Sequence, residues 1–156
     1  MRSTNFVLCK GDTMGLTQEQ IQLVKKSWSP FRRIDPKLVG DVFYSRLFME
    51  HPGLRRLFPK DMDEQYQKLL AMVNLVVGRL NQLEKLAEDI SELARRHVRY
   101  GVKEEHYTAV GNALLWTLEQ GMGREWVPEV RDAWAACYAI LAGTMINASY
   151  PKTQNR

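Results

Sequence analysis

The sequence lacks the features that mark several classes of protein. It has two cysteines in 156 residues, too few for a disulfide framework, so we expect a reducing, cytoplasmic location. No apolar run approaches the roughly twenty residues that a membrane span requires, and the N-terminal stretch is too short and too polar for a secretory signal. Polar and apolar residues never alternate for long enough to make a strand. Together these absences predict an all-α globular protein.

Strong charge of one sign is also missing. The formal net charge is +4, and lysines and arginines alternate with acids along most of the chain. A nucleic-acid binder gathers its basic residues on one face, so we expect no nucleic-acid partner. With 45% hydrophobic and 26% charged residues, the composition and length suit one domain. We expect an arm at 1–15, the folded domain at 16–150 and a polar tail at 151–156.

Helix start signals are clear near the beginning of this domain. Thr17 and Gln20 have the spacing of a capping box. Asp35 followed by Pro36 combines a cap residue with a proline at the first helical position. Gly40, inside that second helix, costs roughly 1 kcal/mol relative to alanine and therefore indicates a close approach by another backbone. Apolar periodicity predicts further helices at about 63–80, within 81–102, at 103–120 and at 127–149, six or more in all. On the first of these, the predicted apolar face consists of Leu69, Met72, Val73, Val76 and Leu80.

Among the three histidines, His97 has the most informative position. It continues an apolar stripe of Leu86, Ile90 and Leu93 at helical spacing, and Gly101 can end the helix soon after it. An inward-facing imidazole beside such a stop suits a single axial bond to haem iron. A core histidine bonded to a backbone carbonyl is the alternative that the spacing alone leaves open.

Four more residues occupy positions where they can contribute to a pocket. Gln65 lies one turn before Leu69, either facing inward with a bonded amide or exposed in a frayed first turn. Tyr44, Phe58 and Tyr107 each suit an ordinary core role when taken singly.

In this order and spacing the residues resemble those of globins, most closely the bacterial single-domain globins and the haem domains of flavohaemoglobins. The resemblance covers about residues 17–149. Its most specific part is the ordered set Tyr44, Phe58, Gln65, Leu69 and His97. It also rests on the segments 16–20, 42–48, 52–58, 65–69, 96–107 and 133–138, and on Trp28.

The resemblance implies a globin fold of six to eight helices around one haem b, without covalent attachment because no Cys-x-x-Cys-His sequence occurs. It implies that His97 is the proximal iron ligand, that Phe58 packs flat on the porphyrin and that Leu69 closes the ligand cavity. Tyr44 and Gln65 would form a distal polar pair that stabilises the partial negative charge of bound dioxygen. Because a glutamine does not ligate iron as a distal histidine can, a five-coordinate ferrous haem is expected.

Other residues have roles implied less directly. The resemblance implies that Tyr107 lies on the proximal side. Lys68 has the reach to contact a haem propionate, although a surface lysine is ordinarily solvated. Arg95, Arg96 and Arg99 can meet propionates or an acidic reductase, and a solvated helix face is the alternative.

The sequence departs from the flavohaemoglobin pattern in two places. A glutamate near the end of the last helix of that family joins the proximal tyrosine and histidine, and the matching position here is Ser149. Without a carboxylate, His97 would push less electron density to the iron, so peroxidase-like chemistry is less supported. The chain also contains no Gly-x-Gly-x-x-Gly stretch, so we expect sustained redox turnover to need an external reductase.

Two functional hypotheses follow from the resemblance. The first is reversible, tight binding of dioxygen, with nitric oxide and carbon monoxide as further ligands, for oxygen transport, storage or sensing. The alternative is nitric oxide detoxification by dioxygenation. A helical interaction module without haem is disfavoured, because such a module has no reason to keep buried polar groups. We expect a monomer or a weak homodimer.

Overall fold

The computed structural model describes residues 15–149, apart from the side chains of residues 83–85, 87 and 88. This part of the chain contains α-helices and short 3₁₀ segments but no strand, which confirms the all-α prediction. None of its helices is long and apolar enough to cross a bilayer. The α-helices are α1 (Gln18–Trp28), α2 (Pro36–Glu50), α3 (Asp63–Gly78), α4 (Ala87–Arg99), α5 (Glu104–Met122) and α6 (Pro128–Ser149). The 3₁₀ segments are η1 (Ser29–Arg33), η2 (Pro52–Leu57), η3 (Leu80–Leu86) and η4 (Gly123–Glu125).

The predicted helix starts are present. The Gln20 amide donates to the Thr17 hydroxyl at 3.0 Å, and the Thr17 amide donates to the Gln20 side chain at 3.1 Å. The Asp35 carboxylate accepts from the Lys37 amide at 3.0 Å, and Pro36 is the first residue of α2. Local hydrogen bonds therefore fix where α1 and α2 begin.

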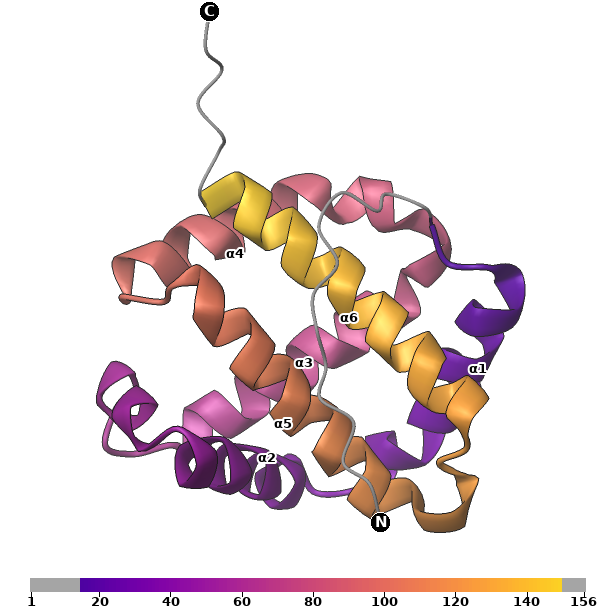
Figure 1. Cartoon of the computed structure of the whole chain (residues 1–156), viewed down its shortest axis with the longest axis horizontal. Helices are drawn as coiled ribbons and strands as arrows, with labels where there is room; N and C mark the ends of the chain where they lie inside the picture. Colours follow the sequence, from indigo (N-terminus) through magenta and orange to yellow (C-terminus); the bar gives the residue numbers. More distant parts are fainter. Residues whose placement is uncertain (1–14, 150–156) are drawn as a thin grey trace, which may run out of the picture.

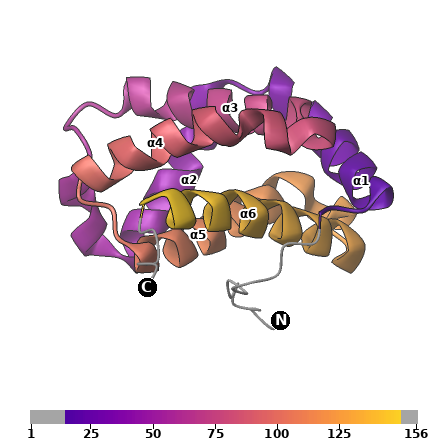
Figure 2. The same ribbon diagram turned by 90° about the horizontal axis from the view of Figure 1, so that it is seen from above.

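The helices form two layers. In Figure 2, α3 and α4 lie above α5 and α6, and Figure 1 shows α5 and α6 crossing the molecule side by side. Helix α4 packs mainly on α6, whereas α2 packs on α3 and α5. Helices α2 and α3, which carry Tyr44 and Gln65, therefore pack mainly on different neighbours from α4, which carries His97.

The buried side chains form three clusters. The first joins α1, η1, α3 and α6 around Trp28 and Trp134, whose ring centroids lie 5.8 Å apart, and it also includes Val39 of α2, Leu80 of η3 and Leu118 of α5. Their indole N–H groups donate to Asn74 at 2.6 Å and to Ser27 at 2.9 Å, so neither is buried without a partner. The second cluster joins α4, α5 and α6, and the third joins α2, η2 and α5. Among the described side chains, those of α4 occur only in the second cluster.

The buried face of α3 differs in part from the prediction. Helix α3 ends at Gly78, so the predicted last apolar residue, Leu80, belongs to η3 instead. Leu70 and Val77 are buried although the pattern omitted them, because α3 contacts α1 as well as α2 and its apolar face is wider than one stripe. The predicted residues Leu69, Met72 and Val73 are partly buried, and Val76 is buried.

Gly40 lies where α2 and α3 cross, as the sequence predicted. A Cβ atom added at Gly40 would lie 2.5 Å from the Cβ atom of Tyr66 on α3. Real carbon atoms do not approach so closely, so any larger residue would push the two helices apart. The absence of a side chain at this position therefore sets the distance between α2 and α3.

We expect Gly40→Ala to lower the free energy of unfolding by roughly 1–3 kcal/mol, because it overpacks the crossing. Gly143→Ala is the matched control in α6, where an added Cβ atom meets nothing within 4 Å. That control should stabilise the protein by roughly 0.5–1 kcal/mol through helix propensity. Urea unfolding followed by circular dichroism measures both changes. A Gly40→Ala protein as stable as the wild type would contradict the close crossing.

Candidate functional site

His97 lies on α4 where the buried stripe of that helix reaches its last turn. Leu86, Ile90 and Ala94 are buried, and the His97 ring is half-buried. Its Nδ1 atom lies 2.9 Å from the Leu93 carbonyl oxygen. Because a carbonyl only accepts, Nδ1 carries the proton in this bond and Nε2 keeps its lone pair. Within the described part of the chain, no hydrogen-bond partner meets Nε2, which is the atom free to ligate a metal.

The pKa of His97 favours the same neutral form. Burial of the ring lowers this pKa, the hydrogen bond with the Leu93 carbonyl opposes the shift, and the charge of Arg96 lowers the pKa further. A neutral imidazole is the form that binds metal ions.

The helix stop predicted at Gly101 is a Schellman motif. Gly101 has φ +92°, a left-handed conformation that side chains disfavour. The Gly101 amide donates to the Val98 carbonyl at 3.0 Å, and the Val102 amide donates to the His97 carbonyl at 3.0 Å. The backbone of His97 is therefore held from its C-terminal side while Leu93 holds its ring.

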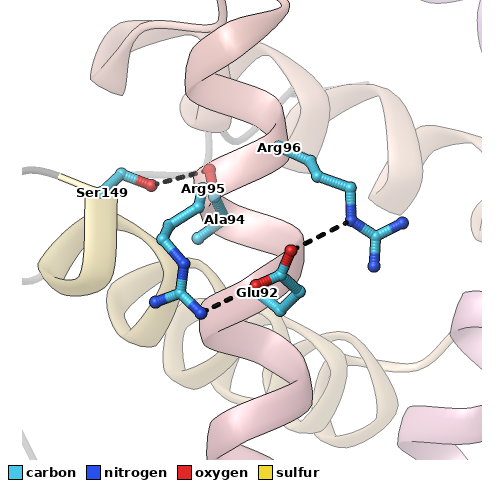
Figure 3. Close-up of polar contacts among 5 residues, drawn as sticks. All are labelled: Glu92, Ala94, Arg95, Arg96 and Ser149. Atoms are coloured by element: carbon cyan, nitrogen blue, oxygen red, sulfur yellow. Dashed lines mark hydrogen bonds and ion pairs between the residues drawn. The ribbon is translucent and has the colours of Figure 1, made fainter.

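Helices α5 and α6 contact α4 near Ala94, one turn before His97. The Ser149 hydroxyl at the end of α6 donates to the Ala94 carbonyl at 3.2 Å, as Figure 3 shows. Tyr107 on α5 is buried in the cluster that includes Ala94, which agrees with a position on the side of α4. The Tyr138 hydroxyl donates to the Tyr107 carbonyl at 2.6 Å and so ties α6 to α5. Ser149 thus meets the backbone of α4 one turn before His97.

The arginines near His97 lie on the outer face of α4. Glu92 accepts from Arg95 at 2.8 Å and lies 3.9 Å from Arg96 (Figure 3). Hydrogen bonding and the charge of Arg95 lower the pKa of Glu92. Both arginine side chains are more than half exposed, at 56% and 52%. This arrangement matches the solvated face that was the alternative for the basic cluster.

Tyr44 and Gln65 meet, as expected of a polar pair. The Gln65 amide donates to the Tyr44 hydroxyl oxygen at 3.2 Å, and the Gln65 side chain is half-buried rather than exposed in a frayed turn. Because the phenol oxygen accepts this bond, its own O–H remains able to donate elsewhere. The pair therefore presents a donor whose direction the amide fixes.

An aromatic shell surrounds the Tyr44 ring. Phe43 and Phe58 meet it edge-on at centroid distances of 4.8 and 5.3 Å, and Phe48 and Tyr66 lie at 5.8 and 5.9 Å. Burial raises the pKa of Tyr44 to about 12, although the hydrogen bond from Gln65 partly opposes the shift. The hydroxyl therefore stays protonated and able to donate at physiological pH.

The remaining predicted residues occupy different surroundings. Leu69 is partly buried and contacts the first and third clusters, so it lies between Tyr44 and the α1–α3 core. Lys68 is 65% exposed and lies 3.7 Å from Glu64 on the outside of α3, as an ordinary solvated lysine does.

Two residues near the site were missed by sequence reasoning. Tyr100 lies with its ring centroid 6.4 Å from that of His97. Arg55 donates to three backbone carbonyls around Phe58. The spacing of Tyr100, three residues after His97, was a usable signal, whereas nothing in the sequence marks Arg55.

The raised pKa of Tyr44 makes a prediction about stability at high pH. A tyrosine whose folded-state pKa exceeds its unfolded value contributes stability that is complete below pH 10 and is lost as the pH rises towards 12. The wild type should therefore lose up to roughly 2–3 kcal/mol more free energy of unfolding over this range than Tyr44→Phe. Urea unfolding at several pH values measures the difference, with Tyr100→Phe as the control for losing an exposed hydroxyl. Equal losses in wild type and Tyr44→Phe would contradict the burial of this group.

Comparisons with known proteins show which family this chain resembles in sequence and fold. The family model described as Globin matches residues 41–145. A globin-like protein of Aquifex aeolicus is 32% identical over 131 residues, which cover 84% of this chain and 92% of the relative. The flavohemoprotein of Bordetella pertussis is 30% identical over 81% of this chain, but the match covers only 32% of that relative, so the chain spans about a third of its length.

Solved structures show the same relationship. A bacterial globin from Campylobacter jejuni superimposes with a TM-score of 0.75 and 26% sequence identity, and the match covers 85% of this chain and 96% of that one. Sequence and fold thus lead to one assignment over most of the described residues. The chain belongs to the globin family.

Proposed function

We propose that this globin binds one haem b with His97 as the axial ligand, and that it holds dioxygen tightly against Tyr44 and Gln65. Nitric oxide and carbon monoxide would be further ligands of the same site. The observation that carries the proposal is the 3.2 Å hydrogen bond from the Gln65 amide to the Tyr44 hydroxyl. This bond leaves the phenolic proton free to donate to a ligand inside an aromatic shell.

The residues present fit a haem. The Nε2 atom of His97 is the atom available as a ligand, since Nδ1 is held by Leu93. Hydrogen bonding at Nδ1 is the usual way to orient such an imidazole and to raise its basicity. Phe58 and Leu69 offer apolar surface on the side of Tyr44. A bound ferrous haem would supply an iron that coordinates a diatomic gas reversibly.

The side chains of Tyr44 and Gln65 determine how tightly the gas is held. A diatomic ligand that gains partial negative charge is stabilised by a donor already pointing at it. The rings around Tyr44 exclude water, and this strengthens each hydrogen bond inside the shell. Because the pKa of Tyr44 is raised to about 12, the donor keeps its proton at every physiological pH. Slow release of dioxygen follows from these properties.

Nitric oxide dioxygenation is the second candidate. The observation that favours it is the same donor pair, because a ligand that is held firmly remains in place until a second reactant arrives. Relatives named flavohemoprotein match this chain over most of its length. Dioxygen and nitric oxide would combine to form nitrate, and an external reductase would supply the electron for each further cycle.

The first test is a hemin titration of the purified chain. We expect a Soret band that saturates at about one hemin per chain, because the proposal assigns the iron to one imidazole, whose Nδ1 atom is already bonded to Leu93. His97→Ala should lose or strongly weaken this band. His51→Ala, a change at an exposed histidine, is the matched control and should bind as the wild type does. A wild-type protein that gives no Soret band would overturn the proposal.

The second test is the rate of oxygen release, measured by stopped flow on the reduced, oxygenated protein. We expect Tyr44→Phe to release oxygen roughly 10- to 100-fold faster than the wild type, because a hydrogen bond to a charged acceptor is lost. Gln65→Leu should also speed release. In the double variant, the fold increase in the release rate should be smaller than the product of the two single increases. Slow wild-type release favours dioxygenation or scavenging, whereas fast release favours storage or delivery. An unchanged rate in Tyr44→Phe would show that the phenol does not contact the ligand.

A further inference from the structure

Arg55 makes an unusual set of contacts at the end of η2. Its guanidinium donates to the carbonyl oxygens of three consecutive residues, Phe58 at 3.3 Å, Pro59 at 2.9 Å and Lys60 at 3.0 Å. The Arg55 side chain is half-buried, and no ion-pair partner for it is present among the residues described. The positive charge is therefore compensated by carbonyl dipoles of the segment 58–60.

The same guanidinium also touches the aromatic shell. Its Cζ atom lies 5.5 Å from the centroid of the Phe48 ring, within the range of a cation–π contact. Phe48 in turn lies 5.4 Å from Phe58 and 5.8 Å from Tyr44, between ring centroids. Arg55 thus holds both the backbone that carries Phe58 and a ring against which Phe58 packs.

The geometry points to Arg55 as a positioning residue that holds Phe58 against Tyr44 and so shapes the distal side of the site. Phe58 adopts an extended conformation at the end of η2, where its N–H makes the last 3₁₀ bond, to the Arg55 carbonyl at 3.1 Å. Beyond that bond, the three hydrogen bonds from the Arg55 side chain fix the segment 58–60. This inference rests on the proposed function only where Phe58 is taken to contact the bound haem.

An arginine is needed for this role. The planar guanidinium presents a fixed fork of donors and can serve three acceptors at once, whereas a lysine ammonium is a point charge on a flexible stem. Arg55→Lys is therefore expected to keep the charge but to restore little of the positioning. A purely electrostatic role would instead be fully restored by lysine.

The first experiment examines the haem-free full chain and so does not depend on the proposed function. Endoproteinase Lys-C cleaves after Lys60, the last residue of the segment 58–60 that Arg55 contacts. The Arg55→Ala change neither adds nor removes a cleavage site of this protease. We expect the initial cleavage rate after Lys60 to rise roughly tenfold in Arg55→Ala, because the segment opens locally. Cleavage after Lys25 and Lys26 in α1 reports global unfolding and should stay unchanged.

Arg56→Ala is the matched control, since Arg56 is the exposed neighbour and no hydrogen bond to this segment involves it. It should leave cleavage after Lys60 at the wild-type rate. An unchanged cleavage rate after Lys60 in Arg55→Ala would show that Arg55 does not hold the segment 58–60. An equal rise in the cleavage rates after Lys60 and Lys26 would show the same.

The second experiment measures hemin loss from the loaded protein to an excess of a haem-accepting apoprotein. If Arg55 acts through Phe58, Arg55→Ala should speed hemin loss several-fold in the wild-type background and have little effect in a Phe58→Leu background. Arg55→Lys should behave more like Arg55→Ala than like the wild type. Equal effects of Arg55→Ala in both backgrounds would overturn a role through Phe58. Absence of hemin binding in all variants would instead count against the proposed function alone. The proteolysis result would then decide whether Arg55 holds the segment 58–60.

Discussion

The close crossing of α2 and α3 at Gly40 is the contact on which the placement of Tyr44 and Gln65 depends. Tyr44 follows Gly40 by one helical turn, and Gln65 immediately precedes Tyr66, the residue that a Cβ atom at Gly40 would strike. The two helices are therefore in close contact beside the point where the Tyr44 hydroxyl and the Gln65 amide meet at 3.2 Å. A side chain at position 40 would push α2 and α3 apart and so lengthen this hydrogen bond without touching either partner, because a close-packed interior transmits such a displacement.

The position of His97 is set by other interactions. His97 is held mainly by local hydrogen bonds: its ring Nδ1 donates to the Leu93 carbonyl, and its own carbonyl accepts from the Val102 amide just beyond α4. The position of α4 as a whole comes from packing on α6, to which the Ser149 hydroxyl adds one polar contact. The imidazole and the phenol are thus positioned by two unrelated sets of interactions, one within a helix and one between helices.

Much of this arrangement was predictable because its signals are local. The Thr17 and Asp35 caps, the need for a small residue at Gly40 and the stop at Gly101 each follow from a few adjacent residues. The inward position of the His97 stripe followed from helical periodicity. These features depend on short-range geometry, which a sequence displays directly.

Other features were beyond the sequence for a common reason. The pattern left two positions open for Gln65, and the choice between them depends on a tyrosine 21 positions away along the chain. The width of the buried face of α3 depends on having neighbours on two sides. The contacts of Arg55 are with backbone carbonyls, which every residue carries, so no sequence pattern marks them. Each case requires knowing which distant segment arrives at a given place.

The restriction of α4 to a single buried cluster has a consequence for cooperativity. Since the described residues of the other two clusters lie outside α4, we expect a partial opening to detach α4 while the other helices stay packed. Amide hydrogen exchange along α4 would then report a smaller free energy than exchange in α1 or α6. A ligand that binds His97 only while α4 is packed shifts the equilibrium towards the packed state. The apparent affinity of that ligand therefore includes the free energy of packing α4.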